Sequence, residues 1–240
     1  MIVWWEIVLI IKFGGTVLKS IEKVVDLIKT ELKNHQKLVI ITSAIGRYPD
    51  AYATDTLMKM GLNVTEEELA QLVSCGEIIS GINLVNELKK EKISAKFLSV
   101  YDLGLEINDN LSLKNEIKLA ESDVFVIPGF IALKDGKIYL LPRGGSNLTA
   151  LFFADYYKTN LMIVSDTDGI YEHNPKLCQS RKLFFVSVTE LIKIIIEEPR
   201  VFPIESIKYF KRNNFIVLYR SLNSKNGSLI GDFSKNSLLI

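Results

Sequence analysis

Five short segments of this 240-residue chain combine glycines with charged or hydroxyl side chains that could bind or react with a ligand. The first reads Lys12-Phe13-Gly14-Gly15-Thr16. A glycine pair directly after an apolar run lets backbone N–H groups approach an anion closely. The neighbouring lysine supplies a point charge that suits phosphate. Because other tight turns also use a glycine pair, this segment alone leaves phosphate binding and a simple turn both open.

Two further segments favour a small-molecule pocket, and each has an ordinary alternative. Ser43-Ala44-Ile45-Gly46-Arg47 offers small residues and a hydroxyl for a substrate, but an ordinary turn would look the same. Ser74-Cys75-Gly76-Glu77 lies inside a long apolar helical pattern, where glycine costs about 1 kcal/mol relative to alanine. Gly76 and Glu77 together indicate one of two arrangements. Either the backbone approaches another segment closely and the carboxylate points into a cavity, or the glycine marks a helix crossing and the glutamate is exposed.

The last two segments combine anion-binding residues with an aromatic ring. Pro142-Arg143-Gly144-Gly145-Ser146-Asn147 precedes a helical pattern. Arginine binds carboxylates bidentately, and a helix N-terminus favours an anion. Ser165-Asp166-Thr167-Asp168-Gly169-Ile170-Tyr171 continues into Asn174-Pro175-Lys176. This segment could hold a nucleotide base or be a plain turn.

The patterns around these segments alternate between strands and helices. Apolar, β-branched runs predict strands over 7–13, 37–43, 95–100, 123–128, 160–165, 215–219 and 228–230. Helical periodicity, with a capping box at Thr65 and Glu68, predicts helices over 20–32, 65–91, 146–157, 188–197 and 204–212. We expect a hairpin turn at Asp135-Gly136 and a loop over the Asn- and Asp-rich residues 107–113. The alternation predicts a three-layer α/β/α sandwich with a mostly parallel central sheet and ligands at the carboxyl ends of its strands.

The composition limits the function classes. With 48% hydrophobic and 24% charged residues, the chain has a soluble globular balance. A net charge of +1 gives no electrostatic footprint for nucleic acid or an anionic membrane. Two cysteines without paired spacing argue against structural zinc or a disulfide framework and fit a reducing cytoplasm. The apolar N-terminal run is cut by Glu6 and is shorter than the about 20 residues that a membrane span needs.

Together, and in this order, the segments resemble the aspartokinases of the amino acid kinase family. Residues 12–16 match the family's KFGGT element, 43–47 its SAMGR, 50–57 its DPYATDSLL, 74–80 its SCGExxS, 128–131 with 143–146 its PGFxG and GRGGSD, 166–171 its TDVDGVY, and 220–221 with 227–230 its RS…GTLI end. The resemblance runs in register from residue 7 to residue 230. It implies one amino acid kinase domain over 1–240, with residues 1–157 binding the amino acid and 158–240 the nucleotide.

The resemblance also implies a reaction. Aspartokinases use ATP and Mg²⁺ to phosphorylate the β-carboxylate of L-aspartate, and the 4-phospho-L-aspartate formed leads towards lysine, threonine and methionine. A carboxylate with a free pKa of about 3.9 is already ionised at neutral pH. The site therefore needs no strong general base and must position two anions.

By the same resemblance, each segment contributes to one of three groups of residues. The phosphates face Lys12, Gly14 and Gly15. Aspartate is held by Ser43, Glu77, Arg143 and Ser146, with the arginine on a carboxylate and the glutamate on the ammonium. The nucleotide is lined by Ser165, Asp166, Tyr171, Lys176 and Arg200, and the catalytic positions are Lys12 and Asn147. The resemblance and the apolar N-terminus together suggest a homodimer.

The chain departs from the family pattern at several positions. Asn147 stands where the family has an aspartate that organises the catalytic lysine and the metal region, and Val17 replaces a serine. Residues 198–200 read Glu-Pro-Arg in place of Gly-Ala-Lys, and 204–205 read Ile-Glu in place of Pro-Arg. Two alternatives therefore stand beside an aspartate kinase. One is a catalytically impaired amino-acid- or nucleotide-binding paralogue that partners an active kinase, and the other is a kinase for another small carboxylate.

Asn147 gives these alternatives a test. Because a missing negative charge should slow the reaction without abolishing it, we expect slow but detectable turnover, and a gain of at least about tenfold, or about 1.4 kcal/mol, in Asn147→Asp. If Asn147 only caps a helix that begins near Leu148, aspartate would serve equally well. A lower rate would mean that the site is rebuilt around asparagine. Family members usually continue into tandem ACT domains, and we expect this chain to be a catalytic domain without them and without feedback inhibition by lysine or threonine.

Overall fold

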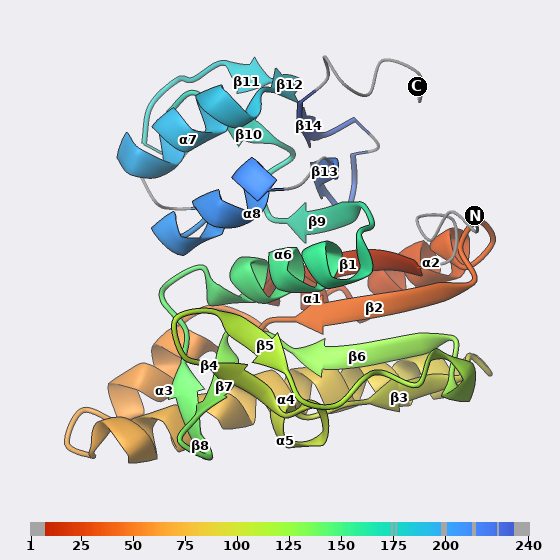
Figure 1. The fold of residues 1–240 in the computed structure, drawn as a ribbon, viewed down its shortest axis with the longest axis vertical. Helices are drawn as coiled ribbons and strands as arrows, with labels where there is room; N and C mark the ends of the chain where they lie inside the picture. The colour runs from red at the N-terminus through yellow and green to blue at the C-terminus, as the bar shows by residue number, and fades with distance from the viewer. Residues whose placement is uncertain are drawn as a thin grey trace.

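An eight-stranded sheet forms the centre of the computed structural model, which describes residues 8–173, 175, 177–197, 201–212, 215–224 and 226–232. Its strands follow one another from top to bottom of Figure 1. In spatial order they are β12 (Phe185–Val186), β14 (Ser228–Ile230), β13 (Val217–Ser221), β9 (Leu161–Ser165), β1 (Val8–Phe13), β2 (Lys37–Thr42), β6 (Val124–Pro128) and β3 (Ala95–Phe97). Neighbours are parallel except β13 and β14, so the expectation of a mostly parallel sheet is confirmed.

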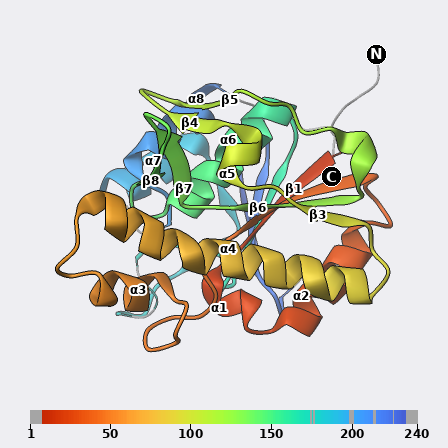
Figure 2. The same cartoon turned by 90° about the horizontal axis from the view of Figure 1, so that it is seen from below.

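Helices cover both faces of this sheet (Figure 2). One face carries α2 (Ile21–Glu31) and α4 (Glu66–Lys90), and the other carries α6 (Gly145–Tyr157), α7 (Val188–Glu197) and α8 (Ile207–Arg212). Successive side chains of a strand point to opposite faces. In β2, Leu38 and Ile40 pack on the α2 side while Val39 and Ile41 pack on the α6 side, and all four are fully buried. The expected three-layer sandwich is confirmed.

Smaller elements complete the fold. The short helices are α1 (Gly15–Leu18), α3 (Thr54–Met60) and α5 (Val100–Leu103), with 3₁₀ turns η2 (Leu119–Glu121) and η3 (Ile204–Ser206). A four-stranded sheet orders β5 (Leu111–Leu113), β4 (Leu105–Ile107), β7 (Ile131–Lys134) and β8 (Lys137–Leu140), and a two-stranded one pairs β10 (Ile170–Tyr171) with β11 (Lys182–Leu183). The β7–β8 hairpin turns at Asp135 and Gly136, whose φ angles of 51° and 77° are left-handed, as its sequence predicts.

Three local expectations are wrong. Residues 107–113 are not a loop, because β4 and β5 pair there as an antiparallel hairpin and only the polar residues between them turn. The strand expected over 95–100 stops at Phe97, because Ser99 and Asp102 form a capping box that opens α5. The helix expected over 204–212 begins as the 3₁₀ turn η3 before α8.

The long helix α4 begins as expected. The Thr65 hydroxyl accepts a hydrogen bond from the Glu68 N–H, and the Glu68 carboxylate accepts one from the Thr65 N–H at 2.9 Å. None of the helices that the structure describes, α4 included, combines the length and apolar character that a membrane crossing needs.

Candidate active site

A cleft of about 900 Å³ opens at the carboxyl edge of the central sheet. Lys12 of β1 and the loops that follow β2, β6 and β9 contribute to its lining, and this edge is where parallel sheets bind ligands. The sequence-expected residues that line it are Lys12, Ser43, Glu77, Arg143, Ser146, Asn147, Ser165, Asp166 and Tyr171. Five segments that lie far apart in the sequence therefore meet around one cavity.

Glu77 is the fully buried ionisable group of the cleft lining, with 1% of its surface exposed. Burial raises the pKa of Glu77 to about 8, opposed by a hydrogen bond from the Ala44 N–H and by the charge of Lys12. Its Oε2 atom has no hydrogen-bond partner among the described residues. Of the two interpretations left open by the sequence, the carboxyl group aimed into a cavity is the one that the structure contains.

Lys12 lines the same cleft one residue before the end of β1. Burial lowers the pKa of Lys12 to about 8, opposed by the negative charges of Glu77 and Asp166. A cation that is partly stripped of water interacts strongly with any anion that enters, because little solvent screens the pair. Lys12 is therefore the natural contact for an anionic group at this end of the cleft.

Gly14 and Gly15 form the turn behind Lys12. A Cβ atom on Gly15 would lie 2.1 Å from the Ala44 carbonyl oxygen, so only glycine fits there. The Gly15 carbonyl accepts a hydrogen bond from the Gly46 N–H at 2.8 Å, which joins the first two segments. The Gly14 N–H donates to the Val164 carbonyl at 2.9 Å and is not available to an anion. The interpretation that the amides of both glycines face a phosphate is therefore wrong for Gly14. The Gly15 N–H stands at the first position of α1, where the helix itself offers it no acceptor.

Gly76 lets the segment before α3 approach α4. A Cβ atom on Gly76 would lie 2.4 Å from the Tyr52 carbonyl oxygen. This close approach brings three residues of α3 into the wall of the cleft, which are Thr54, Asp55 and Met58. The sequence did not single out these residues for the site, although Thr54 and Asp55 fall within the 50–57 segment of the family resemblance.

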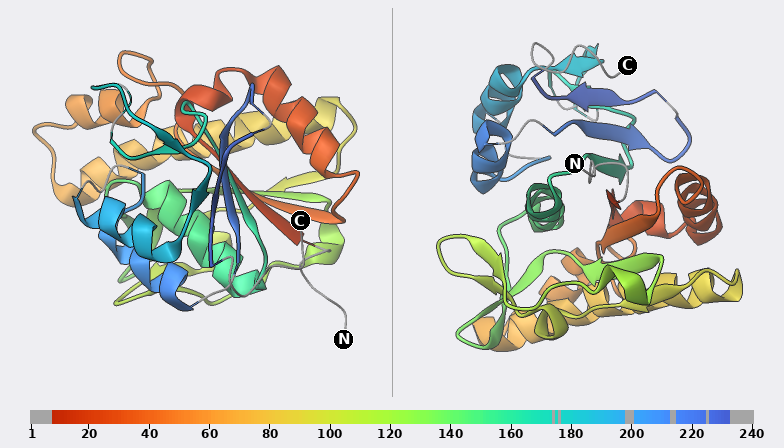
Figure 3. Two further views of the ribbon diagram at one scale, coloured as in Figure 1. Left: turned by 90° about the horizontal axis from the view of Figure 1, so that it is seen from above. Right: turned by 45° about the vertical axis from the view of Figure 1, so that its right-hand side comes forward.

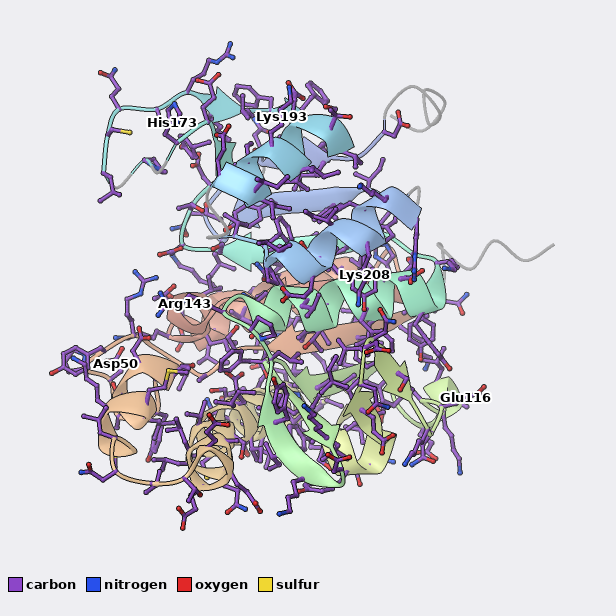
Figure 4. All side chains as sticks on the ribbon, turned by 60° about the vertical axis from the view of Figure 1, so that its left-hand side comes forward. Asp50, Glu116, Arg143, His173, Lys193 and Lys208 are labelled. Carbon is purple, nitrogen blue, oxygen red and sulfur yellow. The ribbon has the colours of Figure 1, made fainter. Side chains whose placement is uncertain are left out.

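The turn before α6 forms a second wall. Gly144 has a φ of 86° and is the N-cap of α6, so the helix begins at Gly145 with Ser146 and Asn147 buried in its first turn. Asn147 is therefore not a capping residue, and that expectation is wrong. Its side-chain Nδ2 donates a hydrogen bond to the Val201 carbonyl, and its Oδ1 has no partner among the described residues. Arg143 is exposed at the mouth of the cleft, on the side of the molecule that also carries Asp50 and His173 (Figure 4).

A further part of the lining, next to the first turn of α6, is apolar. It is built by Leu191, Ile194 and Ile195 of α7 and by Ile170, Val201 and Phe202. The spacing of the α7 residues is that of one helix face and was visible in the sequence. Val201 and Phe202 follow no motif, and only the fold brings them here.

The loop after β9 is held by its own charges. The Tyr171 hydroxyl donates to Asp168 at 2.7 Å, and Lys182 donates to the same carboxylate at 2.9 Å. Both hydrogen bonds lower the pKa of Asp168. Across the cleft, Arg47 forms an ion pair with Asp166 at 3.5 Å, which joins the loops after β2 and β9. No separate role for Arg47 was predicted from the sequence.

Two expected nucleotide-site residues, Lys176 and Arg200, lie outside the described residues, as do positions 198 and 199 of the altered segment. Within the described ranges, no three Asp, Glu, His or Cys side chains gather as a dedicated metal centre would require. The carboxyl groups that line the cleft are those of Asp55, Glu77 and Asp166. Magnesium that arrives with nucleotide phosphates takes only one or two protein carboxylates, so this set is compatible with it.

Known proteins resemble this chain in sequence. The family model described as the amino acid kinase family matches residues 8–199. Aspartokinase 1 of Bacillus subtilis (strain 168) is 26% identical over 245 residues, which cover 93% of this chain and 60% of the relative. The aspartokinase of Rickettsia prowazekii (strain Madrid E) is 28% identical over 188 residues, which cover 71% of this chain and 42% of the relative. The chain thus spans about half the length of these curated relatives.

Solved structures resemble it in fold. Escherichia coli aspartokinase III in complex with aspartate and ADP superimposes with a TM-score of 0.78 at 19% identity, covering 94% of this chain and 64% of that one. Carbamate kinase from Giardia lamblia bound to AMP-PNP gives a TM-score of 0.62 at 12% identity, covering 95% of this chain and 99% of that one. At these identities the likeness establishes a shared fold.

Proposed function

The chain belongs to the amino acid kinase family, and from this premise we propose that it transfers the γ-phosphoryl group of ATP to the β-carboxylate of L-aspartate. One observation carries the proposal. The same cleft is lined by a desolvated lysine, by a buried carboxyl group with a free oxygen, and by an arginine next to the N-terminus of a helix. Support also comes from the aspartokinases among its relatives and from the similar fold that was solved with aspartate and ADP.

The amino acid side of the cleft comes from residues before 158. Glu77 presents its free Oε2 to the ammonium group, and that cation would favour the ionised form of the carboxyl. Arg143 suits a carboxylate of the substrate, because its planar guanidinium binds carboxylates through two parallel hydrogen bonds. The hydroxyls of Ser43 and Ser146 complete this side of the cleft.

The nucleotide side comes mostly from residues after 157. The apolar wall, whose partly exposed members are Ile194 and Val201, suits a flat base, with Tyr171 beside it. Lys12 and the Gly15 amide suit the phosphates, and we assign Lys176 and Arg200 to the same side from the family resemblance. We propose Mg²⁺ as the metal, held mainly by the phosphates with Asp166 as a candidate ligand, where it would neutralise charge during transfer.

The chemistry asks the protein for position and charge. One β-carboxylate oxygen forms a bond to the γ-phosphorus while the bond from that phosphorus to the bridging oxygen breaks, and ADP leaves with the electron pair. Since the nucleophile is already an anion, no side chain has to remove a proton. The acyl phosphate formed would be the first intermediate on the route to lysine, threonine and methionine.

The test is trapping of the acyl phosphate with hydroxylamine. Purified protein with ATP, Mg²⁺ and L-aspartate should give aspartyl hydroxamate above a no-enzyme control and above the Lys12→Met variant. Lys118→Met is the matched control, because Lys118 is an exposed lysine away from the cleft. Product with another small carboxylate but not with aspartate would identify a kinase of different specificity. Nucleotide binding without any hydroxamate would identify the impaired paralogue.

We also propose a homodimer in the cytoplasm. The middle of α4 exposes Ile79 and Ile82, 38% and 50% accessible, with only uncharged residues exposed beside them between Glu68 and Lys89. An exposed apolar stripe of this kind favours association. Cys75 and Cys178 are exposed, and neither belongs to a disulfide in the described part of the chain, which fits a reducing compartment. Sedimentation of the wild type and of Ile82→Lys tests the dimer, and an unchanged mass would remove α4 from the interface.

A further inference from the structure

We propose that Asn147 is a positioning residue whose side-chain amide fastens residues 201–203 to the start of α6 and so fixes the apolar wall of the nucleotide side. The local part of this inference stands on the contacts alone. Its consequence for nucleotide binding rests on the proposed function.

The contact joins two distant parts of the chain. Asn147 is 7% exposed, and its Nδ2 group donates to the carbonyl oxygen of Val201. Both residues line the cleft. Gly144 packs on the same segment, because a Cβ atom built there would lie 3.1 Å from Pro203 Cδ and 3.7 Å from the Val201 carbonyl oxygen. The first turn of α6 and residues 201–203 are therefore in direct contact, and the right-hand view of Figure 3 shows α6 beside α8, the helix that follows this segment.

The fastened segment carries part of the wall. Phe202 is fully buried, and its ring meets that of Phe210 edge to face at 5.1 Å. The Pro203 carbonyl accepts a hydrogen bond from the Ser206 N–H at 2.9 Å, so the segment leads directly into η3 and α8. On its other side lies α7, whose Leu191 and Ile195 complete the wall. A shift at Val201 would displace the surface on which a base would lie.

Only an amide suits this position. Asparagine has an NH₂ donor and a carbonyl acceptor, and here the donor meets Val201 while the acceptor has no partner in the described part of the chain. An ionised aspartate has no donor, so Asn147→Asp would set a carboxylate oxygen against a carbonyl oxygen in a buried site. Protonating the introduced carboxyl would restore an O–H donor. The site is thus built around asparagine, and the expectation that Asn147→Asp raises the rate is replaced by its opposite.

Hydrogen exchange tests the local contact without any ligand. At pH 8, peptides covering residues 201–206 should exchange about tenfold faster or more in Asn147→Asp than in the wild type, after correction for intrinsic rates, while β1 stays unchanged. At pH 5.5 the difference should shrink, because burial favours the protonated, donating form of the carboxyl. In Asn147→Ala, residues 201–206 should exchange faster than in the wild type by a similar factor at pH 8 and at pH 5.5. Asn34→Asp, at an exposed asparagine that follows α2, is the charge-matched control and should match the wild type.

Calorimetric titration with ADP tests the consequence. At pH 8, Asn147→Asp should bind ADP about tenfold more weakly than the wild type. At pH 5.5 the variant should regain part of this affinity. If residues 201–206 of Asn147→Asp were protected from exchange at pH 8 as in the wild type, the inference would be overturned. A loss of ADP affinity in this variant that did not change with pH would also overturn it. A wild type that binds no nucleotide would contradict the proposed function instead, and the exchange data would still decide the role of Asn147.

Discussion

Lys12 on β1 and Glu77 on α4 reach the same cleft, and the ionised form of each opposes the effect of burial on the pKa of the other. Burial raises the pKa of Glu77 to about 8 and lowers the pKa of Lys12 to about 8. Near neutral pH the carboxyl is then largely protonated and the lysine largely charged. A ligand that brings a cation to Glu77 and an anion to Lys12 would turn the pair into two fully ionised contacts.

Binding of aspartate should therefore release a proton. The ammonium group requires ionised Glu77, which below about pH 8 must first lose its proton, so affinity should rise with pH by up to about tenfold per unit and level off above about pH 8. Calorimetry in two buffers of different ionisation enthalpy measures the proton directly. In Glu77→Gln the affinity for aspartate should be weaker and should hardly change with pH. If the affinity of the wild type were equally independent of pH, Glu77 would not contact the ammonium group.

Glu77 should also set the pH dependence of stability. Its pKa is about 8 in the folded protein and near 4.5 in the unfolded chain, so between these values the folded state holds a proton that the unfolded state has lost. The free energy of unfolding should fall as pH rises through this window, by up to about 1.4 kcal/mol per pH unit. Urea titrations from pH 5.5 to 7.5 should show this slope in the wild type but not in Glu77→Gln. Lys12, with its pKa lowered, adds the opposite slope only above about pH 8.

The glycine pair offers a matched test of the turn. Gly15→Ala would press a methyl group against the Ala44 carbonyl oxygen, and the backbone would have to move, so we expect a loss of about 2 kcal/mol or more in unfolding free energy. Gly14→Ala meets its nearest atom at an ordinary 3.5 Å with φ at −70°, so stability should stay within about 1 kcal/mol of the wild type. Equal effects of the two substitutions would mean that the approach of Gly15 to Ala44 does not constrain the turn.

Lys12 should matter for turnover more than for folding. If it stabilises charge on the transferred group, Lys12→Met should lower kcat by about 10²–10³. Burying a neutral side chain in place of a desolvated cation should leave the unfolding free energy equal or higher. Steady-state rates with saturating ATP and aspartate, beside Lys118→Met, provide the measurement. A change confined to KM would assign Lys12 to binding alone.

Much of this arrangement could be read from the sequence, because local patterns carry it. The buried strands and the Thr65–Glu68 capping box predicted the layers, and glycine at 15 and 76 marked two close approaches that the structure contains. The capping box of Ser99 and Asp102 was an equally clear signal, and recognising it would have ended the preceding strand at the right place.

The parts that escaped prediction depend on tertiary contacts. Asn147 looks like a helix cap because it stands before an apolar run, but Gly144 takes that role with a left-handed backbone. Nothing in the sequence pairs Asn147 with Val201, 54 positions further on. Asp55 enters the cleft only because Gly76 lets its segment approach α4. These residues acquire their roles from neighbours that the fold supplies.

The position of β1 in the sheet has a consequence for dissecting the molecule. β1 pairs with β2 on one side and with β9 on the other. The strands β1, β2, β6 and β3 therefore form one half of the sheet, and β9, β13, β14 and β12 form the other. A chain cut between α6 and β9 would leave a long, apolar, unpaired edge on each fragment, and such edges recruit other strands. Neither half should therefore be recoverable as a soluble binding module for its own substrate, whereas the two fragments expressed together should reassemble along the β1–β9 ladder.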